Sequence, residues 1–195
     1  MKILKLTRIG MAAIIASAVI LSFTSCKTQP DDSKDVAQEQ NEVTFDDKDA
    51  ENDADYLIDA AAILEKNAGL GELAESKANS KEVKNLGSAM AKAHTSDLAE
   101  LQSLASSKNI TLPASPTDNT MDAFEDLNDK KGQEFDKLYC DKVVSNHKDA
   151  INHMEAIEKN AVDADIRVWA SKMLPHLRSH LTSAEALQNN VKEKK

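Results

Sequence analysis

The sequence contains few of the residues that interrupt helices. Its 195 residues include only five glycines and four prolines, and aromatic residues make up 4% of the chain. Runs of β-branched residues are rare, whereas alanine, leucine, glutamate and lysine are abundant. Glycine and proline mark turns and β-branched residues favour strands, so this composition predicts long helices and no β-sheet.

Sequence motifs of known catalytic sites are absent too. We find no glycine-rich phosphate loop, no nucleophile elbow and no zinc-protease motif. There is also no Glu-x-x-His pair, although a di-iron site in a helical bundle needs two such pairs and two further glutamates. Ferroxidase-type turnover therefore lacks its ligands, and we expect a binding or structural protein rather than an enzyme.

Acidic residues outnumber basic ones, 33 to 24. The formal net charge is −9, and residues 27–55 alone contain eleven acids against three lysines. The chain after residue 55 is also slightly acidic. Because nucleic-acid-binding domains contact phosphates through a basic patch, this distribution argues against nucleic acid as a partner.

The first 25 residues are organised like a signal peptide. Residues 1–8 hold three basic residues and no acid, and residues 9–23 are almost entirely apolar. A run of about fifteen residues is short for a membrane span but suits an export signal. It ends in small residues before Cys26 and resembles the lipobox of bacterial lipoproteins, although Phe23 replaces the usual aliphatic residue.

The lipobox resemblance implies cleavage before Cys26 and a lipid on that cysteine. The protein would then be exported and anchored in the bacterial cell envelope, facing the periplasm or at the cell surface. The alternative is an ordinary secretory signal with a cysteine nearby.

Residues 26–55 are predicted to form a disordered acidic tether between the lipid and a folded domain. Only Val36, Val43 and Phe45 are sizeable apolar residues in this stretch. So little apolar surface does not offset the entropy that is lost when the chain becomes ordered.

Residues 56–192 are predicted to form one all-α domain. Apolar residues recur every three or four positions in four long stretches, residues 55–78, 79–105, 134–161 and 163–191. The stretches follow each other closely in two pairs, so each pair is expected to fold into an antiparallel hairpin. A connection of roughly twenty residues, with a short helix over residues 116–130, joins the pairs. We therefore predict a ferritin-like four-helix bundle of two hairpins and a long crossover.

Polar residues indicate where these helices begin and end. Asn79 is expected to cap the second long helix. Ser115, followed by proline, is expected to open the short helix, and Gly132 to end it. Asp163 lies where an acid favours the start of the last helix.

Three of the five histidines lie on the apolar stripes of three different helices. His94, His147 and His180 are each roughly 21–25 Å along their helix from the turn of their hairpin, at 1.5 Å per residue. They are therefore expected to meet near the middle of the bundle. Neutral imidazole binds zinc, copper or iron well, so the three histidines form a candidate divalent-metal site.

Other side chains could complete this site or replace the metal. The weaker candidate ligands are Asp136, Glu65 and Glu72. Each buried histidine needs a partner, because an unpaired buried polar group costs about 1–3 kcal/mol. If Tyr139, Asp97, amides or water supply these partners, the histidines have only a structural role.

His176 and Cys140 are two further side chains that could bind a metal or react. His176 lies four residues before His180, so the pair could chelate a cation on the surface of the last helix, which Pro175 is expected to kink. Cys140 is the only cysteine left once Cys26 is lipidated, which excludes a disulfide within the mature chain. Burial raises the pKa of a thiol, so Cys140 is not expected to be a nucleophile.

Several short motifs follow one another in a fixed order. They are Leu73-Ala74, Lys77-Ala78, Val83-Lys84, Met90, His94, Phe135-Asp136, Tyr139, His147, Leu174-Pro175 and His180-Leu181. Together they resemble the ferritin-like bacterial family known as domain of unknown function 4142, over about residues 56–187. The resemblance implies a helical bundle in an exported, often lipid-anchored protein, and it implies no agreed biochemical activity.

The chain departs from the family pattern at two positions. Asn67 stands where the family usually has glutamate, and Ala93 where it usually has aspartate. Both differences remove anionic groups that a divalent metal would favour. The matched positions that remain are Asp136, His94, His147 and His180.

We therefore expect a cell-envelope lipoprotein whose helical domain binds a divalent metal through its core histidines. The alternative is a non-catalytic structural or interaction module of the envelope, without metal. An oxidoreductase would require further carboxylates at the site. The expected partner is the membrane, reached through the lipid on Cys26, and the sequence identifies no protein partner.

Overall fold

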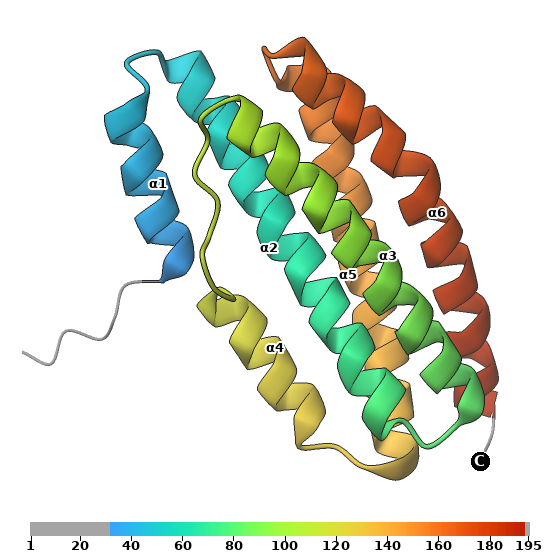
Figure 1. Ribbon diagram of the computed structural model, residues 1–195. Coiled ribbons are helices and arrows are strands. Elements are labelled where there is room, and N and C mark those ends of the chain that lie inside the picture. Colours follow the sequence, from blue (N-terminus) through green and yellow to red (C-terminus); the bar gives the residue numbers. More distant parts are fainter. Residues whose placement is uncertain (1–31, 194–195) are drawn as a thin grey trace, which may run out of the picture.

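The computed structural model describes residues 32–193, and this part of the chain contains helices and no strands (Figure 1). The helices are α1 (Ser33–Thr44), α2 (Lys48–Lys77), α3 (Lys81–Ser107), α4 (Asp118–Asn128), α5 (Gly132–Asn160) and α6 (Ala164–Glu193). The predicted all-α fold class is confirmed. None of these helices is long and apolar enough to cross a membrane. The predicted signal peptide and Cys26 lie outside the described residues.

The long helices α2, α3, α5 and α6 lie side by side, and the shorter α1 and α4 pack against α2 (Figure 1). α2 and α3 form one antiparallel hairpin and α5 and α6 form another, through the short turns 78–80 and 161–163. Residues 108–117 run back past α2 to α4. This crossover brings the start of α5 to the end of the molecule where the α2–α3 turn lies.

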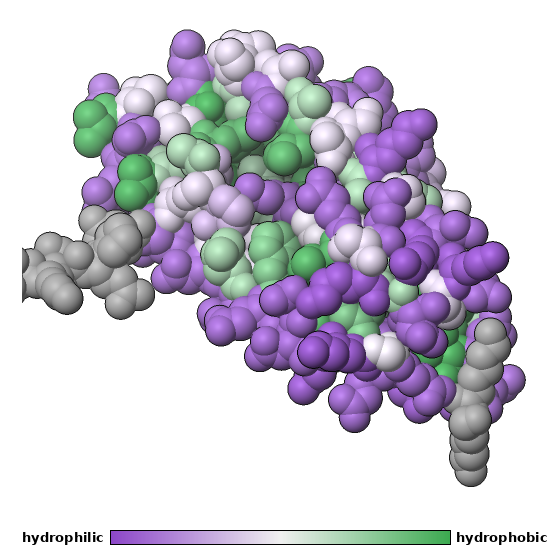
Figure 2. Space-filling view, turned by 60° about the horizontal axis from the view of Figure 1, so that its bottom comes forward, coloured by the Kyte–Doolittle hydropathy of each residue, from purple (hydrophilic) through white to green (hydrophobic). Residues whose placement is uncertain are grey.

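The apolar stripes of the helices face the interior and form two buried clusters. One cluster includes Leu57, Trp169 and Leu177, and the other includes Phe135 and Tyr139. Hydrophilic residues predominate on the face seen in Figure 2, with apolar residues in smaller patches between them. Burial of these stripes is the main force that holds the long helices together.

α2 and α3 approach closely where two glycines face each other. A Cβ atom at Gly71 would lie 2.6 Å from the carbonyl oxygen of Gly87, and one at Gly87 would lie 2.7 Å from the Cβ of Ala74. No real Cβ fits at such distances, so any larger residue would push the two helices apart. The glycines therefore set the spacing of α2 and α3 two turns before His94.

The prediction of a disordered tether up to residue 55 is wrong for the described part of that stretch. Residues 33–44 form α1, and α2 already begins at Lys48. Asn41 is buried and donates from Nδ2 to the carbonyl of Thr111 (2.8 Å), while the Thr111 amide donates to Asn41 Oδ1 (2.8 Å). Counting apolar residues missed this order because α1 is attached largely by polar contacts, to the crossover and to α2. Residues 26–31 lie outside the described residues.

Two predicted helix starts and one helix end are also wrong by a few residues. Ser80, not Asn79, caps α3, because its hydroxyl accepts from the amide of Val83 (3.1 Å). Thr117, not Ser115, caps α4. Gly132, with φ of 57°, begins α5 instead of ending α4. The prediction for α6 is confirmed, because Asp163 accepts from the amides of the first turn.

Two buried aspartates join the hairpins at opposite ends. Asp136 of α5 accepts from the amides of Asn79 (2.8 Å) and Ser80 (2.9 Å) in the α2–α3 turn. Asp53 of α2 accepts from the amides of Val162 (2.9 Å) and Asp163 (2.7 Å) in the α5–α6 turn. Each carboxylate thus satisfies turn amides that lack a helical partner, and each hairpin holds the turn of the other.

Replacing either aspartate is expected to destabilise the fold. In Asp136→Asn the amide group keeps one acceptor and turns a donor toward a buried backbone N–H, so the free energy of unfolding should fall by about 1–3 kcal/mol. Asp53→Asn should have a similar effect. Urea unfolding followed by circular dichroism measures both changes. Asp122→Asn, at an exposed aspartate of α4, is the matched control and should differ from the wild type by less than about 0.5 kcal/mol. Equal stability of all three variants would contradict the role given to the buried pair.

Candidate metal centre

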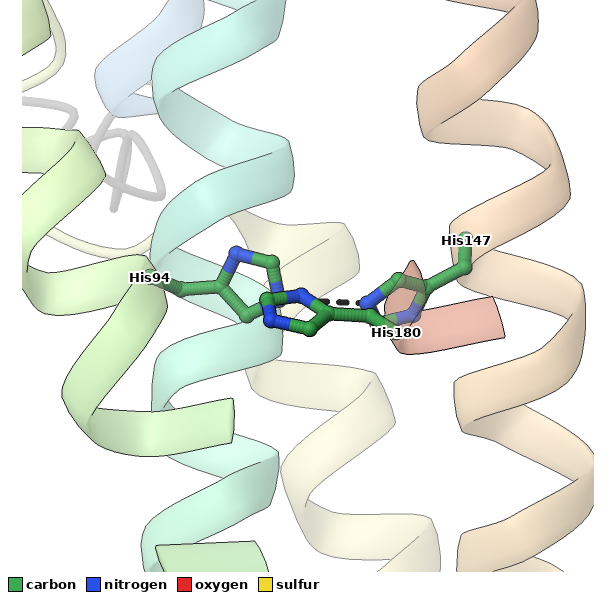
Figure 3. Close-up of side chains that lie close together, drawn as sticks. All are labelled: His94, His147 and His180. Carbon is green, nitrogen blue, oxygen red and sulfur yellow. Dashed lines mark hydrogen bonds between the residues drawn. The ribbon is translucent and has the colours of Figure 1, made fainter. Parts of the chain in front are cut away.

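The three histidines on the apolar stripes meet inside the bundle (Figure 3). His94 comes from α3, His147 from α5 and His180 from α6. Their ring centroids are 5.2 to 5.6 Å apart, and one nitrogen of each ring lies within 4.8 Å of the others. Among the described residues, this is the one group of three or more His, Cys, Asp or Glu side chains close enough to hold an ion. The predicted convergence of the three histidines is confirmed.

The histidines occupy a polar layer between the two apolar clusters. On each of the four long helices the two clusters are separated by a short gap in sequence, and a polar residue stands in each gap. These residues are Asn67 on α2 and the three histidines on α3, α5 and α6. His94 and His147 are completely buried, and His180 is half-buried. The layer therefore has one side that is nearer to solvent, at α6.

The backbone sets the orientation of His147. Its Nδ1 lies 2.8 Å from the carbonyl oxygen of Val143, one turn earlier in α5. A carbonyl only accepts, so Nδ1 carries the proton and Nε2 of the neutral ring carries a lone pair. This lone pair is directed at Nε2 of His94, 3.2 Å away. The role of Val143 was not predicted, although its position four residues before a buried histidine is the signal that points to it.

His94 is placed between two acceptors. Its Nε2 faces the lone pair of His147, and its Nδ1 lies 3.6 Å from Oδ2 of Asp97 in the next turn of α3. A neutral imidazole has one N–H, so either tautomer of His94 leaves one lone pair facing another acceptor. Three buried polar atoms of this cluster have no hydrogen-bond partner: His94 Nδ1, His180 Nδ1 and Asp97 Oδ2.

Burial keeps two of the three histidines neutral. Loss of hydration lowers the pKa of His147 to about 3, and the neighbouring His94 and His180 lower it further, against the opposing effect of the Val143 carbonyl. Loss of hydration also lowers the pKa of His180 to about 4, with His94 adding to the effect and Asp97 opposing it. His147 and His180 are therefore uncharged near pH 7, and an uncharged imidazole is the form that binds metal ions.

The geometry suits a single ion. Bonds of 2.0–2.1 Å in a tetrahedral zinc site place two nitrogen ligands roughly 3.3 Å apart. The nitrogens of His94 and His147 are already 3.2 Å apart. The separations to His180 are no greater than 4.8 Å, so an ion would draw this half-buried ring inward.

The structure does not bring the weaker candidate ligands into this cluster. Asp136 holds the α2–α3 turn instead. Glu72 is exposed beside α4, and Glu65 is half-buried on α2, where loss of hydration raises its pKa. His176 is exposed on α6 and is not one of the three residues of this group, so its pairing with His180 on the helix surface stays a prediction.

Tyr139 and Cys140, the two other residues considered in the sequence, are buried in the second of the two apolar clusters. Tyr139 belongs to the apolar cluster around Phe135, its hydroxyl has no partner, and burial raises its pKa. Burial also raises the pKa of the Cys140 thiol to about 12, with Asp136 adding to the effect. A thiol with such a pKa has almost no thiolate near neutral pH, as expected for a residue that is not a nucleophile.

The stability of the metal-free protein is expected to fall in acid because of His147 and His180, whose pKa values are lowered in the folded state. An unfolded histidine has a pKa near 6.5, so between that value and the lower folded value the unfolded chain binds more protons. Lowering the pH from about 6.5 toward 4 therefore favours unfolding, by up to about 1.4 kcal/mol per pH unit for each histidine. Urea unfolding between pH 4 and 7 in a chelator measures this slope. His147→Leu should reduce it, and an unchanged slope in that variant would be the contrary result.

A comparison with known proteins places the chain in a family. No curated protein and no solved structure is matched by the chain. Residues 38–187 match the family described as domain of unknown function (DUF4142). The matched segment includes the whole of α2 to α5 and the three histidines. The resemblance seen in the motifs is therefore confirmed, and this chain belongs to the domain of unknown function 4142 family.

Proposed function

We propose that this protein binds one transition-metal ion through His94, His147 and His180. The observation that carries the proposal is the contact of 3.2 Å between the Nε2 atoms of His94 and His147. His147 offers only a lone pair there, because its proton is on Nδ1. A cation between the rings lets His94 direct an N–H at Asp97 while both Nε2 lone pairs bind the ion.

Asp97 lies next to the His94 nitrogen that would not bind the ion. A carboxylate that accepts from the far nitrogen of a metal-bound histidine fixes the ring and makes it a stronger ligand. Asp97 Oδ2 is buried, has no other partner and lies 3.6 Å from His94 Nδ1. It also supplies negative charge close to a site whose three ligands are neutral.

The ligand set favours zinc or copper over iron. Imidazole binds all three metals, but mononuclear iron sites commonly include a carboxylate, and di-iron sites need several. The three groups that converge here are all imidazoles. Because His94 and His147 are completely buried, little of the ion would be open to a substrate, so we infer binding of the metal rather than catalysis.

The proposal also includes the type of helical bundle and the location of the protein. We infer a ferritin-like four-helix bundle from the two hairpins and the long crossover that carries α4. We infer a lipid on Cys26 and a position in the bacterial cell envelope from the N-terminal sequence. α1 begins seven residues after Cys26, so the bundle would lie close to the membrane.

Elemental analysis of the purified chain, together with thermal melts with and without zinc or copper, tests the proposal. We expect about one ion per chain, as for a mononuclear site. At a free metal concentration of about 100 times Kd, binding adds about 2.7 kcal/mol, or roughly 5–10 °C in Tm.

His147→Leu is the decisive variant and His153→Leu its matched control on the same helix. Leucine removes the ligand, but it also leaves the buried Nε2 of His94 without its hydrogen-bond partner, so the metal-free variant should be about 1–3 kcal/mol less stable than the wild type. It should show no copurified metal and no metal-induced rise in Tm. His153 contacts the carbonyl of Tyr56 outside the cluster, so its variant should keep both properties.

Absence of metal in the wild type, with no change of Tm on adding either ion, would refute the proposal. The histidines would then be core polar groups. The protein would in that case be a structural or interaction module of the envelope.

A further inference from the structure

The buried cluster needs a path by which an ion reaches it. His94 and His147 are completely buried, whereas His180 is only half-buried. His180 lies on α6, so the more open side of the cluster is at this helix, which borders α3 and α5. α3 and α6 also contact each other far less than the two helices within each hairpin do. An ion that crosses the seam between α3 and α6 disturbs the least packing.

A further imidazole is exposed on α6 near His180. His176 is exposed and lies four residues before His180 in α6, a spacing that places two side chains on one side of a helix. His176 and, from α3, Asp97 both lie close enough to His180 to interact with it electrostatically. From solvent inward there is thus an exposed imidazole, then a half-buried imidazole beside a carboxylate, then two buried imidazoles.

The backbone of α6 is weakened at the same place. Pro175, directly before His176, has no N–H and cannot donate to the carbonyl of Ser171. One backbone hydrogen bond of the helix is therefore missing in the turn that leads to His180. Side chains in this turn move at a lower cost than in an uninterrupted helix.

We propose that metal ions reach the histidine cluster through the seam between α3 and α6, with His176 as the first ligand that passes the ion to His180. This inference depends on the proposed metal binding and adds a residue that is outside the final site. Asp97, with a side chain that is 13% exposed, provides the negative charge that draws a cation into the seam.

A group that contacts the ion only during passage changes rates without changing affinity. His176→Ala should therefore slow both uptake and release of Zn²⁺ by roughly tenfold, the scale on which a local group steers a charged ligand, and leave Kd unchanged. Stopped-flow transfer of Zn²⁺ between the purified mature chain and a chromophoric chelator, followed in both directions, measures both rates. His176→Asp keeps a ligand at this position and should restore most of the rate. Lys172→Ala, at an exposed residue one turn earlier, should behave like the wild type.

The results separate the two proposals. If the wild type takes up Zn²⁺ and His176→Ala does so at the same rate, the path is wrong and the site stands. If His176→Ala weakens Kd without slowing uptake, His176 belongs to the final site and the path is likewise wrong. If the wild type takes up no Zn²⁺, both the site and the path fall.

Discussion

The relative height of the two hairpins depends on the buried aspartates Asp53 and Asp136, and the histidine cluster depends on that height. Each aspartate lies 25 residues before the alanine that caps its own helix, and each binds the turn of the opposite hairpin. A carboxylate that accepts two backbone amides has little freedom to slide. Apolar surfaces alone tolerate a shift of one helix along another far better, because burial has no direction. The position of one hairpin along the other is therefore fixed, and histidines near the middle of three helices come to the same height.

The histidine cluster lowers the stability of the metal-free fold. Two of its rings are removed from water completely, and three polar atoms remain without partners. A layer of leucines would fill the same space without these costs. The proposed metal ion would satisfy the lone pairs that face each other. It would also join α3, α5 and α6 at one point, and so connect the two hairpins at mid-height as the aspartates do at the ends.

Much of the fold was predictable from the sequence because the long helices carry regular apolar stripes. The same stripes placed His94, His147 and His180 on inner faces, and counting residues from the turns placed them at one level. What failed was prediction from composition where polar contacts decide the structure. α1 is ordered through Asn41 and the crossover, and Asp136, a candidate ligand, is a turn-binding group instead. These partners are 56 to 70 residues apart in the chain, and no local pattern reveals them.

The sequence by itself therefore determined the helical class, the approximate extent of five of the six helices and the inward direction of the three histidines, because each follows from the 3.6-residue period of a helix. Only the tertiary structure decided which nitrogen of His147 carries the proton, that Asp97 stands behind His94, and that the carboxylates of Asp136, Glu65 and Glu72 lie elsewhere. These features depend on distances of a few ångströms between side chains of different helices. Such distances are set by how the helices pack and turn against one another, as at Gly71 and Gly87, and not by the period of any single helix.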